Sequence, residues 1–211
     1  ELIENGMAKQ EDIPTFGHRI HKEAQRMITL VSDILQLSEL DGMSKQQENS
    51  PTADFVPVDL GVLVKDVATN MTVNARKAYI TLQYKVQPIT VRGSHDLLTE
   101  LVTNLCDNAI RYNRPGGHVE LSCGTNADGC PYFCVEDNGI GIPQDSQSRV
   151  FERFYRVDKS RSKATGGTGL GLAIVKHAAL YHHATLDLSS ELGVGTTITV
   201  TFPIQQDEPF A

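Results

Sequence analysis

Three things that this chain of 211 residues lacks exclude whole classes of protein. It has no apolar run near the ~18 residues that a membrane-spanning helix needs. It has no excess of basic residues, because it contains 19 Lys and Arg but 26 Asp and Glu. The resulting net charge of −7 argues against general nucleic-acid binding. Its four cysteines form no C-x-x-C pair, and the spacing of Cys130 and Cys134 alone is a poor zinc signature. Buried, reduced thiols in a cytoplasmic protein are the simpler interpretation.

The remaining composition is that of an ordinary globular protein. Hydrophobic residues make up 40% and charged residues 21% of the chain. Its length corresponds to one or two domains. No signal peptide is apparent, and the first residue is Glu1 rather than Met, so we expect a piece of a longer protein.

A long amphipathic pattern predicts a helix over about residues 15–41. Its apolar stripe, with alternate steps of four and three, consists of Ile20, Ala24, Met27, Val31 and Ile34. The stripe is too wide for a lone surface helix. It could pack within its own domain or form half of a helical hairpin that pairs with another chain. We favour the hairpin, because only the short helix end at residues 1–10 lies near enough in sequence to cover it.

The rest of the chain predicts an α+β domain. Residues 42–57 have no apolar period and predict a linker, and residues 206–211 a tail. Between them, residues 58–205 predict a two-layer α/β sandwich, with a mixed sheet covered by helices on one face and preceded by the incomplete hairpin at 1–41. The expected helices are 60–78, 95–112 and 170–181, and the expected strands 80–86, 89–91, 118–123, 132–136, 185–189 and 196–202.

Polar residues repeat every four positions along one predicted helix. Glu100, Asn104 and Asn108 share a face, while apolar residues occupy the other side. Oxygen donors in this pattern suit Mg²⁺, which keeps waters and takes few protein ligands. The alternative is a solvated face, although such faces usually carry Lys and Glu rather than two Asn, which are poor helix formers.

Two glycine-containing segments could bring backbone close to a ligand. Asp137 ends a predicted strand and precedes the segment 138–142, where its carboxylate could accept a hydrogen bond from the exocyclic amine of a base; a plain turn is an equal alternative. Residues 166–171, Gly-Gly-Thr-Gly-Leu-Gly, open directly into a helix and so could bind an anion. They match neither the Walker pattern nor the dinucleotide pattern, which indicates a phosphate loop of another kind.

A basic segment begins between these two motifs and includes the second of them. The segment from Phe151 to Lys176 contains six basic and two acidic residues, within a chain that is acidic overall. A local cationic segment suits a polyphosphate. The alternative is an exposed loop that is charged for solubility.

The order and spacing of these motifs resemble the catalytic and ATP-binding domain of sensor histidine kinases. The polar helix is similar to the N box, 137–142 to the first glycine box, 151–156 to the F box and 166–171 to the second glycine box. Residues 193–196 resemble the final glycine-Thr element. Residues 20–40 resemble the second helix of the dimerisation and phosphotransfer hairpin, and 1–10 the end of its first helix. The variety is most similar to membrane sensor kinases of the phosphate-regulation type.

The resemblance implies two cofactors, ATP and Mg²⁺, and a role for each motif residue. Asn104 would hold Mg²⁺, Asp137 would bind the adenine amino group, and Arg156 would reach the terminal phosphate. Glu100 matches the acid of the N box, so the implied catalytic residues are Glu100, Asn104 and Arg156. The implied ATP-binding residues are Asn104, Asn108, Arg111, Tyr112, Asp137, Gly139, Gly141, Ile142, Tyr155, Arg156, Gly167, Thr168, Gly169, Leu170, Gly171 and Thr197.

The resemblance also implies a reaction and partners. The γ-phosphoryl group of ATP would pass to a His of the hairpin and then to an Asp of a response regulator receiver domain. The full-length protein would be a homodimer through the hairpin, without nucleic acid, and would meet the membrane only through N-terminal segments that are missing here. The chain would then be the cytoplasmic domain of a membrane sensor.

One departure from the family concerns the phosphoacceptor. The family's acceptor His lies in the first hairpin helix, just before an acid and a Leu-Arg/Lys-Thr-Pro run, and this sequence has no such run. His18 and His21 fall on the second helix, so we expect no acceptor in this chain. His182, His183 and Ala184 stand where the family has His-Gly-Gly, which we interpret as a tolerated turn variant.

Two other functions remain open at this stage. One is a water-using ATPase of the same superfamily, against which the hairpin and the short linker argue. The other is a non-catalytic nucleotide-binding dimerisation module, which the missing acceptor supports for this fragment. An acceptor motif upstream of Glu1 would identify the kinase.

Overall fold

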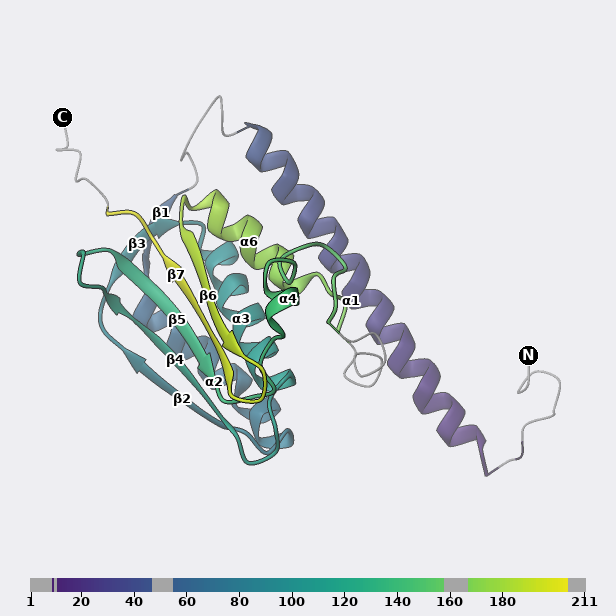
Figure 1. Ribbon diagram of the computed structural model, residues 1–211. Helices are drawn as coiled ribbons and strands as arrows, with labels where there is room; N and C mark the ends of the chain where they lie inside the picture. The colour runs from purple at the N-terminus through teal and green to yellow at the C-terminus, as the bar shows by residue number, and fades with distance from the viewer. Residues whose placement is uncertain (1–8, 10, 47–54, 158–166, 205–211) are drawn as a thin grey trace.

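A computed structural model describes residues 9, 11–46, 55–157 and 167–204 (Figure 1). The elements, in chain order, are α1 (Ile13–Gln46), β1 (Val56–Asp59), α2 (Leu60–Lys77), β2 (Thr81–Val86), β3 (Thr90–Gly93), α3 (His95–Arg111), β4 (His118–Thr125), β5 (Pro131–Asp137), α4 (Gln144–Gln147), α6 (Gly171–Tyr181), β6 (Thr185–Glu191) and β7 (Gly195–Thr201).

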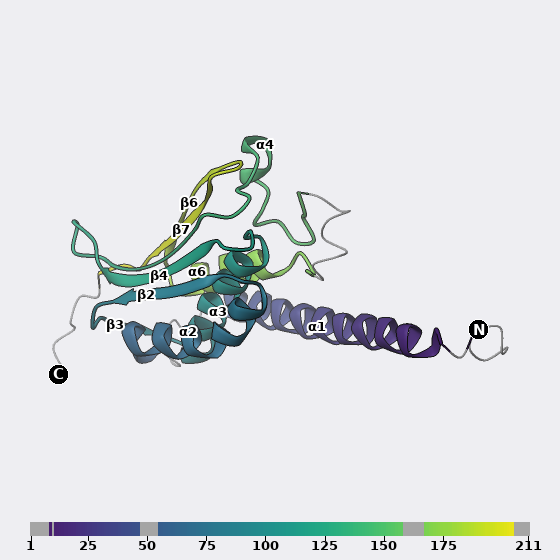
Figure 2. The same cartoon turned by 90° about the horizontal axis from the view of Figure 1, so that it is seen from below.

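The main sheet has five strands in the order β2-β4-β5-β7-β6. The β2–β4 pair is parallel and the other three pairs are antiparallel, so the sheet is mixed. Helices α2, α3 and α6 cover one face of it (Figure 2). The α+β, two-layer fold predicted from the sequence is therefore confirmed.

The core fills the space between the sheet and these helices. Alternating residues of β4 and β5 point inward, among them the fully buried Leu121 and Phe133. Leu98, Leu101 and Leu105 face them from α3 at steps of three and four, as an amphipathic helix requires. Fully burying each such side chain contributes roughly 1.5–3 kcal/mol. The core thereby fixes one face of α3 and leaves its polar face for the site.

Side-chain caps set where two of the sheet-covering helices, α2 and α3, begin. Asp59 accepts a hydrogen bond from the backbone of Val62 at the start of α2, and Ser94 accepts one from Leu97 at the start of α3. Each cap of this kind contributes about 1 kcal/mol.

A buried histidine joins the end of α6 to the start of α3. His182 is 3% exposed, and its Nε2 accepts a hydrogen bond from the backbone N–H of Ser94 at 3.0 Å, so Nδ1 donates to the carbonyl of Ala178. Burial lowers the pKa of this imidazole, in agreement with a neutral ring. His183 follows with a φ of 54°, a conformation that favours glycine, at a position where the resemblance implies glycine.

The structure differs from the sequence-based expectation at both ends of the predicted linker. Helix α1 begins two residues before Thr15 and continues to Gln46, past Gly42, because a single glycine costs a helix only about 1 kcal/mol. Strand β1 begins at Val56 and pairs with β3, and Phe55 before it is already buried. The predicted helix end at residues 1–10 lies outside the described residues except for Lys9, and residues 47–54 also lie outside them.

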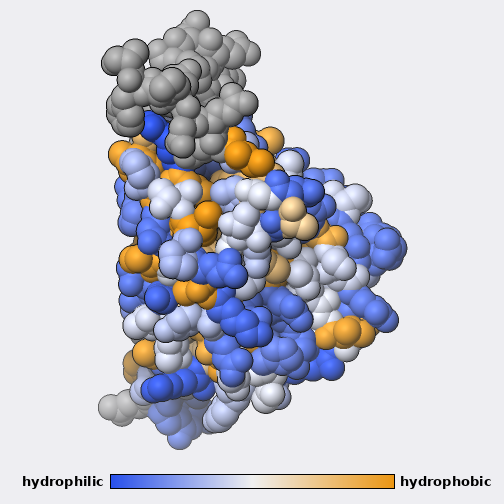
Figure 3. Space-filling model, turned by 90° about the vertical axis from the view of Figure 1, so that its left-hand side faces the viewer, coloured by the Kyte–Doolittle hydropathy of each residue, from blue (hydrophilic) through white to orange (hydrophobic). Residues whose placement is uncertain are grey.

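The long helix α1 packs against α6 and extends beyond the domain (Figure 1). Much of its apolar stripe remains exposed, including Met27 and Val31. The face at the left of Figure 1 has no such continuous stripe. Its hydrophobic side chains lie in small groups within a mostly hydrophilic surface (Figure 3). In the described part of the chain, no helix is both long and apolar enough to span a membrane.

Candidate functional site

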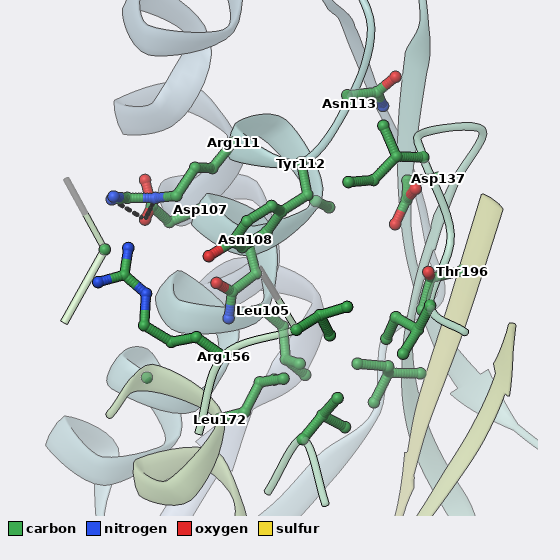
Figure 4. Close-up of a pocket in the computed structure, with 18 of the residues that line it drawn as sticks. Leu105, Asp107, Asn108, Arg111, Tyr112, Asn113, Asp137, Arg156, Leu172 and Thr196 are labelled. Carbon is green, nitrogen blue, oxygen red and sulfur yellow. Dashed lines mark hydrogen bonds and ion pairs between the residues drawn. The ribbon is translucent and has the colours of Figure 1, made fainter. Parts of the chain in front are cut away.

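A cavity of about 720 Å³ lies between α3, the end of β5, the start of α6 and α1. Figure 4 shows that its polar side chains form two groups. Asp137 and Thr196 lie on the strand side, which we call the sheet end. Arg111 and Arg156 lie on the opposite side with Asp107, which we call the arginine end.

Asp137 is the one carboxylate that lines the sheet end among the described residues. It closes β5 and faces Thr196 across the β5–β7 pair. Its Oδ1 accepts the backbone N–H of Gly139 at 2.8 Å, and the backbone of Thr196 also donates to the carboxylate. Burial raises the pKa of Asp137 above its usual value, and these hydrogen bonds offset part of the increase. A partly desolvated acceptor among apolar walls suits a flat ring that carries an amine.

Two close backbone approaches shape this end. Gly141 has a φ of 68°, and a Cβ there would lie 2.0 Å from the carbonyl oxygen of Glu191. Gly195 comes equally close to the carbonyl of Asp137. Arg114 ties the two loops together by donating to the carbonyls of Gly139 and Gly193. The sheet end is therefore held by contacts that already exist without a ligand.

The arginine end contains a buried cation whose hydrogen bonds are incomplete. The Nε and Nη2 atoms of Arg156 are buried and have no hydrogen-bond partner among the described residues. Arg111 differs, because its Nη2 donates to Asp107 at 2.6 Å. A buried guanidinium without an acceptor is costly, so this end is suited to an anion.

The N-terminus of α6 adds further donors to the arginine end. Leu170 stands at its N-cap position without a capping side chain, and Gly171 and Leu172 of the first turn line the cavity. Unpaired N–H groups and the helix dipole attract negative charge at such a terminus. Gly167 adds a tight contact, because a Cβ on it would lie 3.3 Å from the hydroxyl oxygen of Tyr112.

The polar face of α3 borders the same region. Asn104 donates its amide to the carbonyl of Glu100 at 3.1 Å, while its Oδ1 lies beside Gly171, at the start of α6. Glu100 is partly buried but does not line the cavity. Burial, with the charge of Asp33 as a smaller cause, raises the pKa of Glu100 to about 7.

Most of the residues that the resemblance implied for ATP line this cavity together. They are Asn104, Asn108, Arg111, Tyr112, Asp137, Gly141, Ile142, Tyr155, Arg156, Gly167, Thr168, Gly169 and Gly171.

Three implied residues do not line it. Gly139 acts through its N–H bond to Asp137, and Leu170 is fully buried in the core. Thr196 lines the cavity and its neighbour Thr197 does not, because adjacent strand residues point to opposite faces of a sheet. Within the basic segment, Lys159, Arg161 and Lys163 lie outside the described residues, as does Gly166.

The cavity also contains residues that the motifs did not indicate. Thr29 and Asp33 come from α1, and Arg114 follows α3. The spacing of Asp107 and Arg111, four apart on one helix, could have predicted their ion pair. Nothing near Asp33 in sequence indicates that it would meet the glycine-rich segment.

Comparison with known proteins assigns the fold and the site to a class. Residues 93–206 match the family described as histidine kinase-, DNA gyrase B-, and HSP90-like ATPases. This chain belongs to that family.

Within the family, the similar proteins are sensor kinases. The sensor-like histidine kinase SenX3 of Mycolicibacterium smegmatis is 38% identical over 98% of this chain, which spans 53% of SenX3. The mycobacterial sensor histidine kinase MprB has a solved structure that is 31% identical, with a TM-score of 0.61 over 71% of this chain and 97% of that one. Full-length ShkA in complex with AMPPNP is 25% identical, with a TM-score of 0.72 over 90% of this chain and 38% of that one. The predicted resemblance to sensor histidine kinases is thereby confirmed.

Proposed function

We propose that this chain binds ATP with Mg²⁺ in the cavity and serves as the kinase portion of a two-component sensor. In this function the γ-phosphoryl group passes to a His of a dimerisation hairpin and then to an Asp of a response regulator. The observation that carries the proposal is that one cavity has two buried N–H groups of Arg156 without a described partner at one end and the partly buried carboxylate of Asp137 at the other.

The two ends fit the two halves of ATP. Asp137 would accept a hydrogen bond from the adenine amino group, while the close backbone at Gly141 and Gly195 bounds the ring. Arg156, Arg111 and the open N–H groups of α6 would then hold the phosphates. This transfer depends on positioning and charge neutralisation more than on covalent help from the protein.

The metal ligand in this proposal is Asn104. The described residues include no group of three or more His, Cys, Asp or Glu that could hold a metal ion, so the protein would offer few ligands. Asn104 fits, because its Nδ2 is engaged by Glu100 while Oδ1 stays available as a hard oxygen donor. Bound Mg²⁺ would neutralise charge on the phosphates during transfer.

The acceptor and the partners follow from the kinase proposal. His18 and His21 are exposed on α1, and neither precedes an acid, so we propose that another segment supplies the acceptor. The exposed apolar stripe of α1 supports a homodimer through a complete hairpin. Helix α1 would belong to that hairpin and residues 55–204 to the ATP-binding domain, with a linker between them, on the cytoplasmic side of a membrane sensor.

Two assays test the proposal. The first titrates a fluorescent ATP analogue with and without Mg²⁺, and we expect saturable binding that Mg²⁺ tightens in the unaltered chain and tightens less in Asn104→Ala. No saturable binding to a folded sample would refute it. The second incubates the chain with radiolabelled ATP and looks for acid-labile, base-stable label. Label is expected only when a hairpin peptide that carries an acceptor His is added.

A further inference from the structure

A hydrogen bond joins α1 to the glycine-rich segment across 135 positions of the sequence. The hydroxyl of Thr168 donates to Oδ2 of Asp33 at 2.7 Å. Asp33 and Thr29, one turn apart on α1, both line the cavity. Helix α1, which lies outside the ATPase-family match, therefore contributes a carboxylate to the site.

The Asp33 carboxylate lies within electrostatic reach of the arginine end. Burial raises its pKa, while the Thr168 hydrogen bond and the charge of Arg111 lower it. Its charge also contributes to the raised pKa of Glu100. Asp33 thus interacts both with a proposed phosphate-binding cation and with the polar face of α3.

At this position Asp33 should disfavour binding of a phosphate chain for two reasons. The Thr168 hydroxyl has one hydrogen, so it cannot donate to Asp33 and to a phosphate oxygen at the same time. In addition, the carboxylate and the phosphates carry charge of the same sign in a partly desolvated cavity, where repulsion is stronger than in water. Both effects grow with the charge and the reach of the phosphate chain.

We propose that Asp33 is a specificity-determining residue of the nucleotide site, which weakens binding in proportion to the negative charge of the phosphate chain. As a consequence, docking of α1 through Thr168 and binding of the triphosphate oppose each other. The proposal rests on the proposed function, since it requires that the cavity binds a nucleotide.

The test measures affinities of the full chain for adenosine, ADP and ATP by calorimetry in EDTA. Asp33→Asn removes the charge and keeps an acceptor, so it should tighten ATP binding about fivefold, tighten ADP binding less and leave adenosine unchanged. The gain should shrink when the salt concentration rises, because mobile ions screen partly exposed charges.

Glu23→Gln is the matched control. It removes one negative charge from an exposed position of the same helix, ten residues and about 15 Å away, and should change none of the three affinities. A second variant, Asp33→Ala, also removes the acceptor and should gain at least as much for ATP.

The outcomes separate the two proposals. If the unaltered chain binds no nucleotide, the proposed function fails. If it binds but Asp33→Asn leaves the ratio of ATP to adenosine affinity unchanged, or lowers it, the role of Asp33 is overturned. A graded gain from adenosine to ATP in both variants, absent in Glu23→Gln, supports it.

Discussion

The two ends of the cavity differ in how far their polar groups are already paired. At the sheet end, Asp137 receives two backbone N–H bonds and Arg114 joins the two loops beside it. At the arginine end, Arg156 has buried donors without a described partner, and Arg111 is balanced by Asp107. A preorganised end can select a base by its shape. An end with unbalanced charge completes its hydrogen bonds and ion pairs only when an anion binds there. The predictions below test this contrast, from the largest expected effect to the smallest.

The largest effect should come from breaking the backbone packing of the sheet end. Gly141→Ala combines an unfavourable φ with a collision against the Glu191 carbonyl, so it should lower the free energy of unfolding by about 3 kcal/mol. Urea denaturation measures this change. The matched control is Gly193→Ala, whose φ of 87° is similar but whose Cβ would meet nothing within 4 Å. Equal losses in the two variants would mean that the close approach does not matter.

A charge removed from the arginine end should lower ligand affinity without lowering the stability of the free protein. Arg156→Gln takes away a buried cation without a described partner, so the free protein should be no less stable, while ATP affinity should fall about 30-fold, or ~2 kcal/mol. Adenosine affinity should stay the same. Thermal unfolding without ligand and calorimetry with both ligands measure these quantities. A protein that loses stability and keeps its ATP affinity would show that Arg156 is a structural residue.

The base selectivity of the sheet end should respond to a smaller change. Asp137→Asn keeps the shape of the side chain but weakens the acceptor, and it should reduce ATP affinity about tenfold, or ~1.4 kcal/mol. GTP, which has no amino group at the corresponding ring position, should be affected less. Asp128→Asn, on the exposed β4–β5 turn, controls for the loss of one negative charge. Equal losses for ATP and GTP would argue against recognition of the amine.

The sequence predicted which residues of the candidate site lie together where one element carries several of them. Asn104, Asn108 and Arg111 lie on one face of α3, and helical periodicity alone brings them together. The cavity-lining residue of β7 was harder to predict, because Thr196 and Thr197 are adjacent and of the same type. The alternation of side chains along β7 after Gly195 decides which of them faces the cavity.

Contacts between distant elements could not be predicted in this way. Asp33 meets Thr168 only because α1 packs against α6, and no local pattern encodes that packing. Strand β1 has four residues, too few for an alternation of polar and apolar positions to be recognised. It forms because it pairs with β3. Tertiary contact, rather than local propensity, determines both features.

The last prediction concerns pH and the polar face of α3, beside the arginine end. The pKa of Glu100 is raised from 4.5 to about 7, so the folded state binds more protons than the unfolded state between these values. The contribution of this group to stability is therefore fully present below about pH 4.5 and is lost as the pH rises to about 7. His182 acts in the opposite direction, because its lowered pKa makes the folded state less stable as the pH falls below 6.5.

A comparison of variants isolates the part due to Glu100. Unfolding free energies measured from pH 5 to pH 8 should decline less steeply with rising pH in Glu100→Gln than in the unaltered chain, while the His182 contribution stays common to both. Asp33→Asn should also flatten the decline, because the charge of Asp33 is one of the two causes of the raised pKa. Since burial is the larger cause, this second flattening should be the smaller one. If Asp33→Asn leaves the profile unchanged, α1 does not dock beside Glu100 in solution, and the arginine end is formed without it.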